Sequence, residues 1–336
     1  MRIRQCVAVL AATFFCASSA LAADQCPPLK IKASVDMVPL KNGRFMIPVS
    51  VAGHPAYFVV ATANPQSSIS SAVAEEYKFP REHSHVNFVG LAGQVSDKLA
   101  TLPTFRIGNL KAEHVRLLMV DSGDHPAPQD GAMVPSGMLG AEFLRAYDVD
   151  LDFGANKMNL ISREHCAGNV LYWNSERLAT LPMSVDNDGK IRFKMTLDGH
   201  ELDAVLNTAI PMSTIRMNTA HNLYDVDNDT AGNQREGALE NGTPLYSHTF
   251  KSLAFEGLSI SNPKLVLMPS LADAKIRHLE ARGNPLKLVL PVQPQLVLGM
   301  AELRKLHVYI DYHNQTIYFT PATPGGDQPK AASAAP

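Results

Sequence analysis

The sequence lacks the features that mark several large classes of protein. Its 30 basic residues do not exceed its 32 acidic ones, so the charge indicates neither nucleic-acid binding nor disorder. Aromatic residues make up 7% of the chain, with one Trp, so no stacking platform is indicated. Beyond the N-terminal residues, no apolar run is long enough to cross a bilayer. We therefore expect no nucleic-acid partner and no membrane insertion of the mature chain.

Motifs for metal, phosphate or serine chemistry are also missing. No glycine-rich phosphate loop occurs, and Ser67 has no G-x-S-x-G context. His83 and His85 share one strand face but lack a third ligand nearby. Residues 225–236 resemble a calcium loop, but Thr230 stands where glycine is required, which favours a solvated polar loop. We predict no metal and no cofactor.

The first 22 residues have the pattern of a signal peptide. Arg2 and Arg4 precede a short apolar run over residues 7–15, and Ala20-Leu21-Ala22 forms an A-x-A cleavage site. The apolar run is too short to span a membrane comfortably. We therefore expect residues 1–22 to be removed and the mature protein to be periplasmic or secreted.

Cysteine is scarce, and half of it lies in the signal peptide. Cys6 and Cys16 would leave with that segment, so Cys26 and Cys166 are the pair that remains. In an oxidising compartment a disulfide is the natural use of such a pair, and two free thiols are the alternative. We predict a Cys26–Cys166 bond.

Short strands separated by turns dominate the pattern. Residues 44–51 and 56–60 flank Gly53-His54 as a hairpin, and residues 149–153 and 158–161 flank a second one. Helical patterns are confined to short segments, of which residues 71–77 and 141–147 are the clearest. The fold class is therefore all-β.

The chain contains an internal duplication. Four blocks recur in the same order in both halves, and one insertion in the second half accounts for the differences in spacing. The matched blocks are residues 41–53 with 188–199, 56–69 with 202–215, 138–144 with 297–303, and 149–153 with 308–312. Each half is therefore one copy of a repeated unit.

This order of blocks resembles the retropepsin- and pepsin-like aspartic protease superfamily, in particular its bacterial exported members. In that family each half contributes a strand that ends in Asp-Thr/Ser-Gly-Ala, and two apolar residues and a glycine later pack behind the loop. The resemblance implies two tandem β-barrel lobes, over residues 27–165 and 170–322, with a central groove. The Pro-, Gly- and Ala-rich residues 323–336 would form a disordered tail.

The two loops depart from the family at the catalytic positions. The family's aspartate falls on Ala61 and Asn207, and its glycine falls on Ala63 and Ala209. The threonine of each loop is retained, as Thr62 and Thr208, and the resemblance implies that these hydroxyls hold the two lobes together. Residues 86–94, with Gly90 and Gly93, occupy the place of the family's flap, although a plain glycine-containing hairpin is the alternative reading.

The departures predict a degenerate active site. Two carboxyls must share one proton, so that one activates water while the other donates to the scissile carbonyl. Alanine can do neither, and asparagine cannot exchange a proton at neutral pH. We therefore expect no catalytic residues and no peptidase activity, but a pseudoprotease that binds an extended peptide or a protein partner.

Two alternatives stay open. One is an active aspartic endopeptidase that uses relocated groups, for which Asp203, four residues before Asn207, is a candidate. The other is a purely structural protein whose groove has closed. Cleavage assays separate the first alternative from the pseudoprotease, and peptide binding separates the second.

Overall fold

The computed structural model describes residues 26–89, 95–120, 133–168, 170–239, 242–269 and 293–325. Strands dominate these residues and helices are few and short, which confirms the predicted all-β class. The predicted signal peptide, Gly90 and Gly93 of the candidate flap, and the tail from residue 326 lie outside the described residues. No helix within the described residues has the length and hydropathy of a membrane span.

The first lobe is built on an eight-stranded sheet with the order β2-β3-β4-β9-β5-β8-β7-β6. Alternate residues of β3, including Ile47 and Val51, are fully buried, as a half-buried strand requires. Ala52 and Gly53 both have positive φ, the geometry of a tight hairpin turn, so the predicted hairpin forms. The strands are β2 (Val38–Pro39), β3 (Phe45–Val51), β4 (His54–Val60), β5 (Ser68–Ser70), β6 (Arg81–Val89), β7 (Val95–Ile107), β8 (Leu110–Val120) and β9 (Gly137–Leu139).

The second lobe repeats this plan in a ten-stranded sheet. β14 and β15 form the matching hairpin around Asp198 and Gly199, which also have positive φ. β15 then pairs in parallel with β22, as β4 pairs with β9. The strands are β13 (Ser184–Val185), β14 (Ile191–Leu197), β15 (His200–Leu206), β16 (Thr214–Arg216), β17 (Gln234–Ala238), β18 (Pro244–Thr249), β19 (Ser252–Phe255), β20 (Leu258–Ser261), β21 (Lys264–Met268) and β22 (Leu296–Leu298).

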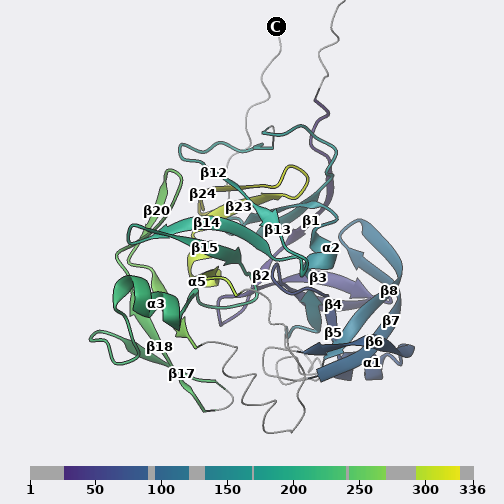
Figure 1. The fold of residues 1–336 in the computed structure, drawn as a ribbon. Coiled ribbons are helices and arrows are strands. Elements are labelled where there is room, and N and C mark those ends of the chain that lie inside the picture. Colours follow the sequence, from purple (N-terminus) through teal and green to yellow (C-terminus); the bar gives the residue numbers. More distant parts are fainter. Residues whose placement is uncertain are drawn as a thin grey trace, which may run out of the picture.

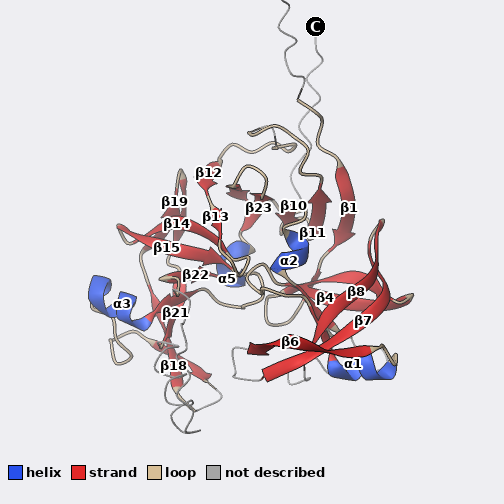
Figure 2. Cartoon of the chain, turned by 45° about the vertical axis from the view of Figure 1, so that its right-hand side comes forward, coloured by secondary structure: helices blue, strands red, loops and turns tan. Residues whose placement is uncertain are grey.

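A six-stranded sheet joins the two halves, in the order β1-β11-β10-β23-β24-β12. The junction is the antiparallel pair β10–β23, where Val149 faces Ile310 and Leu151 faces Val308. Figures 1 and 2 show the two lobes side by side with this sheet spanning them. Its strands are β1 (Ile31–Asp36), β10 (Asp148–Asp152), β11 (Lys157–Ile161), β12 (Ala179–Pro182), β23 (Leu306–Asp311) and β24 (Thr316–Pro321). The duplication read from the sequence is thus a two-lobed fold.

Among the described residues, four short helices flank the sheets: α1 (Ser71–Glu76), α2 (Ala141–Leu144), α3 (Met217–Tyr224) and α5 (Met300–Leu303). α1 ends within a residue of its prediction. The predicted helix over residues 141–147 is wrong in length, because α2 ends at Leu144 and a turn follows in which Ala146 N donates to Phe143 O at 3.2 Å. α3 follows β16 as α1 follows β5, and the sequence pattern did not reveal it.

Residues 162–168 and 170–178, called the strap below, lie across one face of the six-stranded sheet. Trp173 stacks on His307 of β23, with ring centroids 3.9 Å apart, and its Nε1 donates to Thr320 Oγ1 of β24 at 3.1 Å. The predicted Cys26–Cys166 disulfide is confirmed and ties the start of the described chain to this strap. A disulfide fits a protein of an extracytoplasmic, oxidising compartment.

Candidate functional site

The candidate site lies where β4 and β15 end. There each strand leads into the loop that matches the family motif, at residues 61–63 and 207–209. The backbone N–H of Ala61 donates to Leu139 O at 3.0 Å, and that of Asn207 donates to Leu298 O at 3.0 Å. Each loop is therefore held against the later strand of its own lobe, β9 or β22, by the same bond. The two loops are matched parts of the repeat.

Reciprocal hydrogen bonds between the two threonines join the loops across the lobes. Thr62 Oγ1 donates to Leu206 O at 3.0 Å, and Thr208 Oγ1 donates to Val60 O at 2.6 Å. Each hydroxyl also accepts the backbone N–H of the other threonine at 3.2 Å. Both threonines are buried, so these bonds form away from water. The two loops therefore face each other directly.

The side chains at the two dyad positions offer no acid and no base. The methyl group of Ala61 is fully buried. Asn207 is half-buried, and its Oδ1 accepts the backbone N–H of Ala209 at 2.9 Å, so the amide is tied to its own loop. Ala63 and Ala209 lie outside the residues with positive φ, so alanine is accommodated at both without backbone strain. What remains is a hydrogen-bonding amide beside a methyl group.

Gly140 and Gly299 lie directly behind the two loops. The N–H of Gly140 donates to Ser67 Oγ at 2.8 Å, and that of Gly299 donates to Ser213 Oγ at 2.9 Å. A Cβ on Gly299 would stand 2.5 Å from Met212 O, so only glycine fits there. The serines were not predicted as site residues, although each stands in a repeated block five residues after a loop threonine.

Glu142 supports the first loop from behind. Its Oε1 accepts the backbone N–H of Ser67 at 2.7 Å, while its Oε2 is buried without a hydrogen-bond partner. The second lobe has Ala301 at the matching place in the repeat, so the two loops are not supported alike. This contact could not be predicted from the sequence, because it joins residues that are far apart along the chain.

The other carboxylates considered from the sequence have structural partners. Asp203 is exposed and pairs with Lys194 at 2.8 Å. Asp152 Oδ1 accepts the N–H groups of Gly154 and Ala155, and Asp311 accepts that of Asn314, so both aspartates cap hairpin turns. These three carboxylates are therefore engaged in contacts of the fold.

Three buried side chains, Asp148, His165 and Asp311, have potential metal-ligand atoms within 4.8 Å of one another. The sequence analysis predicted no metal site and did not bring these residues together. Each already has protein partners: His165 Nε2 contacts Asp148, and Asp311 caps its turn.

In the predicted polar loop, Glu236 pairs with Lys264 at 2.6 Å, and Asp227 contacts His221.

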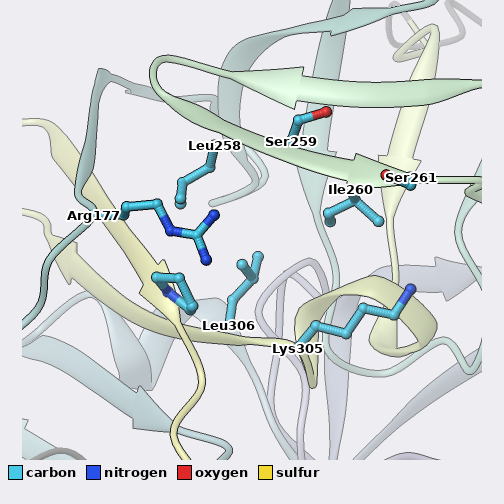
Figure 3. Close-up of a pocket in the computed structure, with 8 residues that line it drawn as sticks. Arg177, Leu258, Ser259, Ile260, Ser261, Lys305 and Leu306 are labelled. Atoms are coloured by element: carbon cyan, nitrogen blue, oxygen red, sulfur yellow. The ribbon is translucent and has the colours of Figure 1, made fainter.

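A shallow pocket of about 240 Å³ lies away from the loops, between β20 and the ends of β23 and β24. Figure 3 shows the guanidinium of Arg177 between Leu258 and Leu306, so this side chain occupies part of the space. Lys305, at its rim, is paired with Glu302 at 2.6 Å. The pocket holds none of the residues predicted for the site.

β6 and β7 pair as a hairpin at one edge of the first sheet. The connection that contains Gly90 and Gly93 lies outside the described residues, so the flap stays a prediction. Figures 1 and 2 show β6 on the side of the first lobe that is nearer the second lobe. Within the described residues, β6 pairs only with β7, which leaves one edge of the strand open.

Two β lobes that meet through paired threonine-bearing loops define an aspartic-protease-like fold. Residues 47–143, which lie in the first lobe, match the family model described as "Aspartyl protease". Among solved structures, the chain is similar to basic 7S globulin from soybean, with 9% identity and a TM-score of 0.48 over 88% of this chain and 96% of that one. No curated protein sequence matches the chain.

Proposed function

We propose that the protein is an exported, catalytically inactive relative of the aspartic proteases that binds an extended peptide segment between its lobes. The observation that carries the proposal is the pair of loops. The threonines that join the lobes are kept in full hydrogen-bonded contact, whereas Ala61 and Asn207 stand where the chemistry needs two carboxyls.

The chemical part of the proposal follows from proton transfer. A positioned acid or base contributes about 10²–10⁴-fold to a rate, and this site has neither. The amide of Asn207 can donate a hydrogen bond to a peptide carbonyl, but it cannot take a proton from water. A peptide at these loops would therefore be held without being cut.

The binding part rests on the open edge of β6 and on the paired lobes. An extended peptide that adds to a strand edge gains main-chain hydrogen bonds, whatever its sequence. β6 lies on the side of the first lobe that is nearer the second lobe, which supports a peptide that lies between the lobes (Figure 2). Side-chain contacts on the lobe surfaces would then select among peptides.

Incubation with a proteome-derived peptide mixture tests both parts, if retained peptides and cleavage products are read by mass spectrometry. We expect a set of retained peptides and no new termini. The matched control is a retained peptide resynthesised with alternate N-methylated amides, which cannot add as a strand. Retention of no peptide would favour a closed, structural protein, and equal retention of the methylated peptide would rule out strand addition.

Export is the second element of the proposal. The signal-peptide pattern of residues 1–22 and the Cys26–Cys166 bond support it. N-terminal sequencing of the protein from its native source should begin near Ala23, and it should be recovered from the periplasm or the medium. A protein that begins at Met1 and stays in the cytoplasm would contradict the proposal.

A further inference from the structure

The sheet face that carries Asn207 also carries two arginines. Leu206, Ile215 and Leu298 are fully buried in the second-lobe core. Because strand residues alternate between faces, Val205, Thr214 and Arg216 lie on the opposite face, on which Asn207 follows Val205. Arg192 is paired directly with Val205 across the β14–β15 hairpin, so it shares this face.

Arg216 is held in place but pairs with no carboxylate in the part of the chain that the structure describes. Its backbone N–H donates to Gln295 O at 2.9 Å, which fixes the end of β16 against the approach to β22. Its Nη2 is buried and has no hydrogen-bond partner within the described residues. Burial, and to a lesser degree the neighbouring charge of Arg192, lower the pKa of Arg216.

Arg192, in contrast, is fixed by a carboxylate. Its Nε donates to Asp186 Oδ2 at 3.1 Å, and Asp186 Oδ1 in turn accepts the backbone N–H groups of Asp188 and Lys190. Lys190 pairs with Asp188 at 2.7 Å. The local charges therefore balance except for that of Arg216, whose guanidinium has a buried donor available for an anion.

We propose that Arg216, with Arg192 beside it, binds a side-chain carboxylate of the extended peptide, so that the protein selects acidic peptides. The inference rests on the proposed peptide binding and names the class of peptide. A guanidinium presents paired donors that match a carboxylate, and a partner anion would satisfy the buried Nη2. The half-buried side chains of Thr214 and Val297 lie on the same face and would contact the peptide around that carboxylate.

Fluorescence anisotropy with two labelled decapeptides tests the proposal. One alternates Ser and Glu, and the other alternates Ser and Gln. The wild-type protein should bind the acidic peptide about 10-fold or more tightly, as a charge-assisted bond implies. Arg216→Met should reduce this preference to within about 2-fold and leave the affinity for the neutral peptide unchanged. Arg216→Lys should retain part of the preference, because lysine keeps the positive charge but lacks the paired donors of the guanidinium.

Arg116→Met, which removes an exposed first-lobe arginine paired with Glu82, is the matched control and should keep the full preference. Free citrate, added as a competitor, distinguishes a site for small anions from one for peptide carboxylates, and displacement at equal carboxylate concentration would overturn the peptide assignment. Equal affinity of the wild type for both peptides, or a preference that survives Arg216→Met in a folded variant, would overturn the inference while peptide binding stands. Failure to bind either peptide would remove both proposals.

Discussion

At the scale of single residues, Thr62 and Thr208 show that the joining of the lobes and the chemistry of the loops are separable. Both hydroxyls donate to a carbonyl of the opposite loop and accept an N–H from it. These bonds need no carboxylate at positions 61 and 207. The contact between the lobes is therefore complete with alanine at position 61 and asparagine at position 207.

Thr208→Val tests that structural role, because valine keeps the shape and removes the hydroxyl. Val60 O loses its donor and Thr62 N loses its acceptor, both in a buried place. We expect a loss of roughly 1–3 kcal/mol of unfolding free energy per unpaired group, measured by denaturant titration. Thr180→Val on strand β12 should change stability by less than about 0.5 kcal/mol. Equal effects of the two changes would show that the cross-lobe bonds are not important for stability.

Restoring the carboxyls tests the chemical reading of the same loops. Asn207→Asp alone should give no peptidase activity, because one carboxyl cannot share a proton with a methyl group. Ala61→Asp with Asn207→Asp brings two carboxyls together, and their repulsion should raise one pKa above the other. Cleavage of a peptide mixture at acidic pH, measured by mass spectrometry, is expected for the double variant only. Activity in the single variant would mean that another group supplies the second role.

Residue-scale reading of the sequence located residues whose place the family resemblance names, and it missed residues whose partners are distant in sequence. Thr62 and Thr208 could be placed because each ends a matching strand in the duplicated pattern. Arg216 and Glu142 have no counterpart in the other half and make their contacts across strands that are distant in sequence. A single sequence carries no signal for such contacts.

At the scale of elements, the turns behind the loops explain why glycine is kept at positions 140 and 299. A Cβ on Gly140 would lie 2.5 Å from Gln66 C, much as one on Gly299 would press on Met212. Glycine at these two positions thus allows the chain to pass from β9 into α2, and from β22 into α5, in close contact with the loops. The family resemblance had predicted their place but not this contact.

Gly299→Ala should therefore destabilise the second lobe. The added methyl must displace backbone rather than a flexible side chain, so we expect a cost of about 1–3 kcal/mol, read from the denaturant midpoint. Gly140→Ala should behave alike in the first lobe. Gly43→Ala is a useful comparison, because its Cβ would meet nothing within 4 Å and only its positive φ resists the change. A smaller loss at Gly299 than at Gly43 would contradict the close-packing account.

Elements held by distant contacts were the hardest to predict. β1 and β12 read as unremarkable segments in the sequence, yet they form the two edges of the six-stranded sheet. The strap has no regular pattern, because its position depends on Trp173 and on the disulfide rather than on its own periodicity.

At the scale of the whole molecule, the strap and the six-stranded sheet share a buried polar network. His165 on the strap contacts Asp148 of β10, and His307 Nε2 lies 2.6 Å from Asp150 Oδ1. Burial raises the pKa of Asp148, in spite of the hydrogen bond from His165. Burial lowers the pKa of His165, but its bonds to Asp148 and to the Cys166 carbonyl outweigh that effect and raise it.

These shifts predict how stability depends on pH. Groups with raised pKa bind protons more tightly in the folded state, so their stabilisation is present at low pH and is lost as the pH rises through the folded pKa. The melting temperature of the wild type, relative to the double variant Asp148→Asn with His165→Asn, should therefore be highest at acidic pH and should fall as the pH rises above the ordinary pKa values of 3.8 for Asp148 and 6.5 for His165. Calorimetry over these pH values checks this, and a difference that stays constant or grows with pH would refute it.

The two-lobed plan of the molecule could be read from the sequence because it is duplicated. Short motifs that are weak alone became specific when their order recurred, and β4–β9 and β15–β22 realise that order in matching pairings. The pairing of strands between the two lobes could not be predicted from the duplication. It depends on β10 and β23, which belong to different copies of the repeat.

The inactivity proposed for this site means that paired loops without carboxyls hold the lobes together but do not cut peptides. Its most direct test is the wild-type protein, purified free of contaminating protease and incubated with a complex peptide mixture from pH 3 to 8, with cleavage products counted by mass spectrometry. The account predicts no new peptide termini at any pH. Cleavage that a transition-state analogue of aspartic proteases inhibits would contradict it.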